Sequence, residues 1–413
     1  MLRINSSIVA NINKNFDNSS ETDTIVEDFI FTFKHVNQED FSSTKAENAT
    51  KNFFVVYKDM NSSAVLHIFG RRAYFDAFCG NIILRDLRNI AEHVIANQTV
   101  PEWVDKFDID VESLGTKILR NTETKGREYW KSRLSLCKES TSLKVMPNTD
   151  LEKSEQIGNI HLPVIDARSI ECYAHEYGLT VCNLVLSAYQ ILLHLVTNAE
   201  RIPVLMEIDL RLHIPECSKQ VAPCSNFIPM ISPCFSPFYA SIQQYLSENS
   251  QTMTEGTLHG MFPQFSIEKL QEWDTKLHKT HFFLFSDTTG HHPYINMGSI
   301  MIEKDPQFET MVISKHDSEK HTLELDFHYC PRRVPSYFAS IFGDNLTFLI
   351  QSLKEISEKN LAHLQTRASL DGGLPVILPP GKTVFALTYL KYRIQNKNVT
   401  VNCPKSNDFI LRD

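Results

Sequence analysis

The chain lacks several patterns that would assign a function directly. It has no apolar run of about 18 residues, so we expect no transmembrane helix. Its first residues have no apolar core of a signal peptide. It also has no Gly-rich phosphate loop and no Gly-x-Ser-x-Gly nucleophile elbow. These absences argue against membrane proteins, P-loop or dinucleotide-binding enzymes, and serine hydrolases of that type.

Basic charge and paired cysteines are also lacking. The formal net charge of −8 argues against a nucleic-acid partner, because phosphate binding needs a basic face. The nine cysteines are scattered, and none forms a Cys-x-x-Cys pair or a set with zinc-ligand spacing. We therefore expect the thiols to be free, the compartment to be reducing and the location to be cytoplasmic. We expect no bound metal.

Composition divides the 413 residues into two lobes with flanking segments. A polar, Asn- and Ser-rich start predicts a disordered arm, and a stretch with Pro147 and Pro163 predicts a linker. The expected organisation is an arm over 1–24, a first ordered region over 25–145, a linker over 146–165, a second ordered region over 166–357 and a tail over 358–413.

Apolar periodicity predicts a β-hairpin, several helices and a group of strands. Residues 52–57 and 64–69 alternate as a hairpin, and 79–94 show helical spacing. A short helix is expected over 128–136, after an irregular stretch over 95–115. In the second half we expect helices over 166–177, 180–196, 237–250 and 336–357, and strands over 203–208 and 227–232. A meander of strands is expected over 281–286, 300–302, 308–314 and 322–329.

A short motif separates the predicted hairpin from the helix that follows it. It consists of Arg71, Arg72, Asp76 and Ala77. This layout resembles the His-His-x-x-x-Asp-Gly element of condensation domains from nonribosomal peptide synthetases. In that family the second His carries the proton-transfer chemistry. Here both His positions hold Arg and the Gly position holds Ala.

Five further segments resemble markers of the same family in the same order. The resemblance implies an α/β (α+β) fold with two chloramphenicol-acetyltransferase-like lobes, each a mixed sheet packed with helices. They would form a V-shaped pseudo-dimer with a central tunnel. The family's opening helix-and-strand segment is barely present, so the resemblance implies that 25–145 is a truncated N-terminal lobe and 166–357 the C-terminal lobe. The tail over 358–413 resembles the remnant of a following domain. The matching segments are residues 128–134, 178–211, 221–229, 259–263 and 291–296.

The family resemblance makes Arg72 the position on which catalysis depends. A general base needs a pKa near neutrality, whereas a guanidinium stays protonated and has no lone pair to accept a proton. Arg72 could still donate hydrogen bonds to an oxyanion, or bind a carboxylate or phosphate. Loss of a general base typically slows a reaction by about 10²–10⁴-fold.

The resemblance also assigns roles to residues outside the catalytic position. Asp76 is expected to be structural, either paired with Arg211 or capping the helix that follows it. Arg71, Asn226 and His259 would line the substrate tunnel. For two of them a structural role stays open: Asn226 as a turn residue, and His259 as a residue that orders its loop. His67 is a weaker candidate to replace the lost base, and residues 291–296 imitate the catalytic pattern at the wrong place in the chain.

These observations leave several functions open. The first is acyl or peptidyl transfer from a carrier-bound thioester to an amine or hydroxyl acceptor, with impaired or lost catalysis. The others are a non-catalytic docking platform for carrier proteins or tailoring enzymes, a fragment of a larger synthetase, and a coenzyme-A-dependent acyltransferase, which also needs the His. The resemblance implies no bound cofactor. It implies instead the phosphopantetheine arm of partner carrier proteins as substrate, and carriers or neighbouring synthetase domains as partners.

Overall fold

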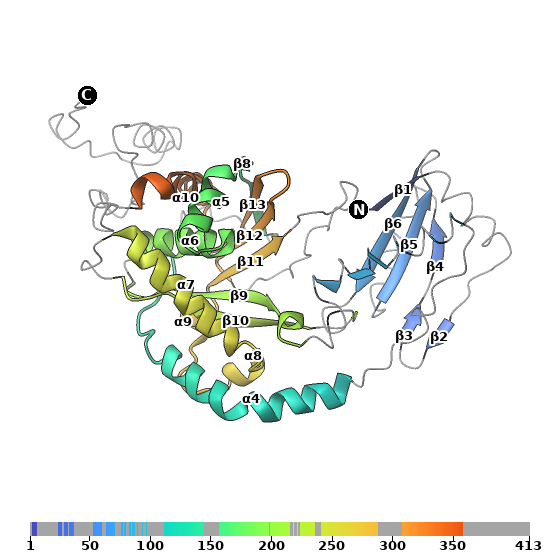
Figure 1. The fold of residues 1–413 in the computed structure, drawn as a ribbon, viewed down its shortest axis with the longest axis horizontal. Helices are drawn as coiled ribbons and strands as arrows, with labels where there is room; N and C mark the ends of the chain where they lie inside the picture. Colours follow the sequence, from blue (N-terminus) through green and yellow to red (C-terminus); the bar gives the residue numbers. More distant parts are fainter. Residues whose placement is uncertain are drawn as a thin grey trace. The chain divides into compact units, whose positions relative to one another are not determined.

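The protein is described here by a computed structural model (Figure 1). It describes residues 2–5, 24–26, 29–31, 33–36, 53–59, 63–70, 111–143, 157–197, 199–214, 224–235, 241–287 and 308–357, with single positions between 76 and 96 and at 218 and 221. The chain divides into two compact units. The first unit comprises Met1–Ile118, Asp209–Asn226 and His291–Met301, and the second comprises Leu119–Ile208, Phe227–Gly290 and Ile302–Asp413.

The first unit contains a four-stranded sheet in the order β1-β6-β5-β4. β5 (Phe53–Asp59) and β6 (Ser63–Gly70) are antiparallel neighbours, which confirms the predicted hairpin. β4 (Phe33–Val36) runs parallel to β5. β2 (Thr24–Val26) and β3 (Phe29–Phe31) form a separate antiparallel pair.

The start of the chain differs from its prediction. The sequence predicted a disordered arm over 1–24, but β1 (Leu2–Asn5) pairs with β6 in antiparallel register. Leu2 and Ile4 alternate with polar residues, as a strand requires, and the edge of β6 supplies hydrogen-bonding partners for the β1 backbone. A short alternating segment inside a polar stretch was therefore overlooked.

The second unit is built on a mixed seven-stranded sheet. Its order is β10-β9-β11-β12-β13-β7, and β8 also pairs with β13. β7 and β8 fall within or beside the expected linker at 146–165, so part of that range belongs to this sheet. The strands are β7 (Gly158–His161), β8 (Ile165–Asp166), β9 (Pro203–Asp209), β10 (Ser225–Ile231), β11 (His281–Asp287), β12 (Thr310–Asp317) and β13 (Thr322–Tyr329).

The predicted meander placed a strand at 300–302, outside the described residues, between β11 and β12, but these two strands pair directly with each other. β12 and β13 are antiparallel, as a meander requires, but β11 and β12 are parallel. In their register His281 lies opposite Thr310, so both strands begin at the same end of the sheet. Apolar alternation identifies a strand but carries no information about its direction, so a parallel crossover could not be distinguished from a hairpin.

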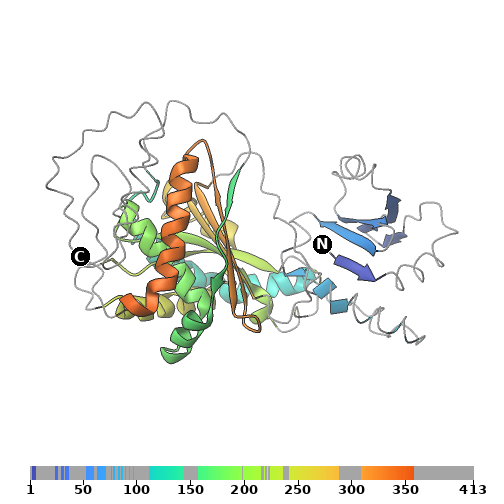
Figure 2. The same ribbon diagram turned by 90° about the horizontal axis from the view of Figure 1, so that it is seen from above.

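Helices α5 (Arg168–Glu176), α6 (Val181–Thr197) and α10 (Ser336–Ile356) pack together beside the sheet (Figures 1 and 2). Phe342 on α10 stacks on Phe327 of β13, with ring centroids 5.1 Å apart. α6 is almost wholly buried, which explains why its sequence is apolar around its full circumference. α7 (Ile242–Leu258) begins later and ends later than predicted. Its start is marked by Ser241, whose hydroxyl caps the helix by accepting the Gln244 N–H at 3.2 Å.

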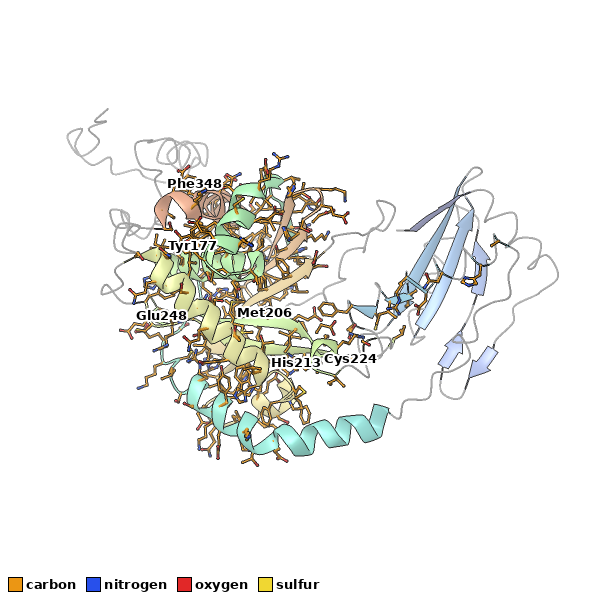
Figure 3. All side chains as sticks on the ribbon, in the orientation of Figure 1. Tyr177, Met206, His213, Cys224, Glu248 and Phe348 are labelled. Carbon is orange, nitrogen blue, oxygen red and sulfur yellow. The ribbon has the colours of Figure 1, made fainter. Side chains whose placement is uncertain are left out.

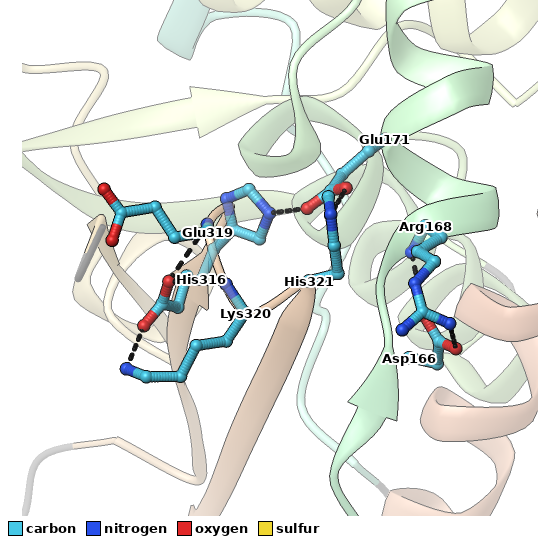
Figure 4. A network of polar contacts seen from close by, with 8 residues as sticks. Asp166, Arg168, Glu171, His316, Glu319, Lys320 and His321 are labelled. Atoms are coloured by element: carbon cyan, nitrogen blue, oxygen red, sulfur yellow. Dashed lines mark hydrogen bonds and ion pairs between the residues drawn. The ribbon is translucent and has the colours of Figure 1, made fainter. Parts of the chain in front are cut away.

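A cluster of polar contacts connects the β12–β13 hairpin to the first turn of α5 (Figure 4). Glu171 lies 2.8 Å from Nε2 of His316 and 2.6 Å from Nδ1 of His321. His321 has a positive φ of 53°, the only such non-glycine residue among those described. The contact with Glu171 therefore holds a hairpin residue in the left-handed conformation, which residues other than glycine adopt only uncommonly.

Helix α4 (Val111–Leu134) is much longer than the predicted short helix. No proline occurs between Pro101 and Pro147, so nothing in the covalent chain interrupts it. Its last turns are buried through Trp130 and Leu134. Across the described residues no single helix has the length and apolarity to cross a membrane; only α5 and α6 taken together do, and they meet at 100°.

Gly126 on α4 provides a test of this packing. A Cβ placed there would lie 2.8 Å from Cβ of Phe262, which is buried. Alanine gains about 1 kcal/mol in helix propensity, but overpacking costs about 1–3 kcal/mol. We expect Gly126→Ala to lower the free energy of unfolding by about 1 kcal/mol, measured by urea denaturation. The exposed Thr124→Ala on the same helix should leave it unchanged or slightly higher; equal behaviour of the two variants would contradict the close packing.

Candidate functional site

The carboxylate of Asp76 is the centre of a buried cluster in the first unit. Its side chain is 1% exposed. Oδ1 accepts the backbone N–H of Cys79 at 2.9 Å. Oδ2 accepts Nη1 of Arg211 at 3.0 Å and the backbone N–H of Cys224 at 2.6 Å. One carboxylate thus joins its own segment to two positions, Arg211 and Cys224, that lie 135 and 148 residues later in the sequence.

Arg211 reaches Asp76 from a short 3-10 turn, η3 (Leu210–Leu212), at the end of β9. The Asp209 carboxylate caps this turn by accepting the backbone N–H of Arg211 at 3.0 Å. The same Oδ1 atom also accepts Nη1 of Arg211 at 3.0 Å. Burial by itself lowers the pKa of Arg211, but the hydrogen bond and charge of Asp76 outweigh it and raise that pKa above its ordinary value.

The two structural roles expected for Asp76 occur together. It pairs with Arg211, and its contact with the Cys79 N–H is the hydrogen bond that an N-cap residue makes. A backbone hydrogen bond from the Cys79 N–H to the Asp76 carbonyl, at 3.2 Å, accompanies it. Sequence reasoning weighed these roles as alternatives, but two carboxylate oxygens can serve both.

Sequence reasoning missed two neighbours of this ion pair, Cys79 and Cys224. Cys224 precedes β10 and is labelled in Figure 3. Sγ of Cys79 lies 3.4 Å from Nη2 of Arg211. Burial, and next the charge of Asp76, raise the pKa of Cys79 to about 11. The thiol therefore stays protonated and does not serve as a nucleophile. No sequence signal marked these cysteines, since the contacts to Asp76 use their backbone N–H groups.

Several predicted site residues lie outside the described residues. They are Arg71, Arg72 and the 291–296 segment. His67 belongs to β6, where only the backbone is described. The predicted roles of these residues stay predictions.

Asn226 is the second residue of β10, not a turn residue as one alternative held. It is buried and belongs to the first unit, as do Asp76 and Arg211. A lining role in a tunnel stays a prediction for it.

His259 belongs to the second unit, where it ends α7. Its ring stacks on Tyr129 of α4, with centroids 4.1 Å apart, and its carbonyl accepts Nε1 of Trp130 at 3.2 Å. Burial lowers the pKa of His259. These contacts fit the loop-ordering alternative, and a tunnel-lining role for His259 stays a prediction.

Metal chemistry finds no support in the described part of the chain. Its His, Cys, Asp and Glu side chains form no group of three or more that could hold a metal ion.

Comparison with known proteins adds a family match. A family model described as Condensation domain matches residues 73–332, which is more than half of the chain. The match begins directly after Arg72. A search of curated proteins finds no match.

Solved structures of related domains share the fold. The complex of the X-domain and OxyB from teicoplanin biosynthesis matches with a TM-score of 0.63 at 13% identity, covering 85% of this chain and 80% of that chain. The epimerization domain from the third module of tyrocidine synthetase B gives 0.62 at 11% identity, with 86% and 91% covered. The first condensation domain of the calcium-dependent antibiotic synthetase gives 0.60 at 13%, with 80% and 76% covered. The predicted α+β fold of chloramphenicol-acetyltransferase-like type, with mixed sheets and packed helices, is confirmed.

Proposed function

The chain belongs to the condensation domain family, and from that premise we propose that it binds carrier-bound acyl or peptidyl thioesters with lost or severely impaired catalysis. The observation that carries the proposal is the contrast between two positions of one motif. Asp76 keeps its buried partner Arg211, whereas the position of the catalytic His holds Arg72. The scaffold is retained and the base is replaced.

Asp76 is a poor substitute for that base. Both of its oxygens are occupied by three donors, from Cys79, Arg211 and Cys224. A general base must approach the proton it abstracts to within about 2.6–3.2 Å, and a side chain that is 1% exposed cannot do so without breaking this cluster. The retained carboxylate therefore supports a structural role.

The partners that follow from this proposal are peptidyl or acyl carrier proteins, or neighbouring synthetase domains, in the cytoplasm. The phosphopantetheine arm of a carrier would be the group that enters the site, and Arg71 and Arg72 could pair with its phosphate. Every cysteine that the structure describes is a free thiol, in accord with a reducing compartment.

A docking platform for a tailoring enzyme is the second candidate. One observation favours it: the X-domain that this chain resembles was solved in complex with OxyB. Such a function needs the fold and an exposed surface but no general base, so Arg72 would not impair it.

Binding and turnover should be measured on the same protein. A carrier protein would be loaded with a stable amide analogue of the acyl thioester and titrated against the chain, with the unloaded carrier as control. Tighter binding of the loaded carrier, together with no amide product from thioester-loaded donor and acceptor carriers, would support the proposal. Rapid amide formation, or equal affinity for loaded and unloaded carriers, would refute it.

A further inference from the structure

A local turn presents the guanidinium of Arg211 to Asp76. Asp209 is the last residue of β9, and Arg211 follows two residues later on η3. Oδ1 of Asp209 accepts the backbone N–H of Arg211 at 3.0 Å and also accepts Nη1 of the Arg211 side chain at 3.0 Å. One carboxylate oxygen therefore holds Arg211 both at its backbone and at its charged end.

Nη1 of Arg211 is shared between two carboxylates. It donates to Oδ2 of Asp76 at 3.0 Å and to Oδ1 of Asp209 at 3.0 Å, so each of its two hydrogens has an acceptor of its own. On the other arm of the guanidinium, Nη2 lies 3.4 Å from Sγ of Cys79. All of these residues lie in the first unit. The planar group is thus held on both arms, and Asp209 is the partner that comes from its own turn.

The backbone of Cys224 connects the same turn to Asp76. Its carbonyl accepts the Leu210 N–H at 2.8 Å, and its N–H donates to Oδ2 of Asp76 at 2.6 Å. The backbone of η3 is therefore placed by Asp209 at one residue and by Cys224 at the next. Fixing a long arginine side chain costs conformational entropy. Asp209 reduces that cost, because it holds the guanidinium from a neighbouring position in the chain.

The second unit contains an exposed copy of this Asp-x-Arg turn. Asp166 accepts the backbone N–H of Arg168 at 3.1 Å and Nη1 of Arg168 at 3.0 Å. The side chains of Arg168 and Asp166 are 69% and 62% exposed, and no other carboxylate in the described part of the chain pairs with Arg168. Local contacts therefore suffice to form the turn. At Arg211 the same turn is shielded from water and has Asp76 as a second partner.

We propose that Asp209 is a positioning residue, which orients the guanidinium of Arg211 so that Nη1 meets Asp76. Through that pair it fixes the carboxylate near the end of the motif that begins at Arg71. This role goes beyond that of a cap, which needs only the contact with the Arg211 backbone. The proposal concerns the retained scaffold, and its test uses no carrier protein, so it stands or falls independently of the proposed function.

Two substitutions separate positioning from capping. Asp209→Ser keeps a hydroxyl that can cap η3 but is too short to reach Nη1 as well, whereas Asp209→Asn keeps Oδ1 for both donors. The readout is the nitrogen NMR spectrum of the Arg211 guanidinium, where rotation about the Nε–Cζ bond exchanges Nη1 with Nη2. Loss of a hydrogen bond to a charged group should make this rotation about 10–100-fold faster in Asp209→Ser. In Asp209→Asn it should stay close to the wild-type rate.

Asp166→Ser is the matched control, because it makes the same change in the exposed turn. It should leave the Arg211 signals unchanged. Amide hydrogen exchange of Cys224 is a second readout, since its N–H shares Oδ2 of Asp76 with Nη1 of Arg211. This exchange should be faster in Asp209→Ser than in Asp209→Asn.

A wild-type rotation rate of the Arg211 guanidinium in Asp209→Ser would overturn the proposal and leave Asp209 as a cap. Should Asp209→Ser fail to fold, scalar couplings across the hydrogen bonds of the wild-type protein decide. Couplings from Nη1 to the carboxyl carbons of both Asp76 and Asp209 support the proposal. A coupling to Asp76 alone overturns it.

Discussion

Arg211→Met should lower the free energy of unfolding of the first unit by about 3–5 kcal/mol. The variant removes the charged partner of Asp76 while keeping a side chain of similar length. The carboxylate would remain in a site where it is 1% exposed, held only by two backbone N–H groups. A buried charge without its counterion costs far more than a surface ion pair contributes, because water cannot replace the lost partner.

Urea denaturation followed by circular dichroism measures this loss. Arg168→Met is the matched control, since Arg168 also pairs with an aspartate at 3.0 Å but is 69% exposed. That variant should change stability by less than about 1 kcal/mol. Combining Arg211→Met with Asp76→Asn should cost less than the sum of the two single changes, because the double variant leaves no buried charge unpaired. Equal losses of stability for Arg211→Met and Arg168→Met would contradict a stabilising role of the buried ion pair between Asp76 and Arg211.

The parts of the fold that were predictable carry their pattern locally. The hairpin β5–β6 and the helices α5, α6 and α10 follow from apolar spacing within one segment, and each lies close to its expected range. The pairing of Asp76 with Arg211 was predicted in a different way. The family resemblance implied an ion pair between two positions that could be identified in the sequence.

The parts that escaped prediction depend on contacts between distant segments. Cys224 joins the cluster through its backbone N–H, which every residue but proline possesses. The residue type at this position therefore gave no indication of the contact with Asp76. The parallel pairing of β11 with β12 depends on a crossover that neither strand encodes. α4 extends well before the apolar residues that were recognised, because the helix continues wherever proline and a stop signal are absent.

The replacement of the catalytic His predicts a large loss of rate. We expect the wild-type chain to form an amide from donor and acceptor carriers about 10²–10⁴-fold more slowly than a condensation domain that has the His. The reason is that the guanidinium of Arg72 holds its proton at every relevant pH and has no lone pair for the acceptor amine. Single-turnover assays with thioester-loaded carriers, followed by mass spectrometry of the carrier-bound product, give this rate directly.

Arg72→His tests whether the base alone is missing. The variant restores an imidazole that can titrate near neutral pH, but Arg71 still stands in the position of the first His and Ala77 in that of the Gly. We therefore expect the single change to leave amide formation close to the wild-type level, and the triple change Arg71→His, Arg72→His, Ala77→Gly to raise it. Arg85→His, which adds an imidazole at an exposed position on the following helix, controls for unspecific effects of a new histidine. Full recovery by Arg72→His alone would show that the retained scaffold of Asp76 and Arg211 suffices for catalysis, and that the other two departures are neutral.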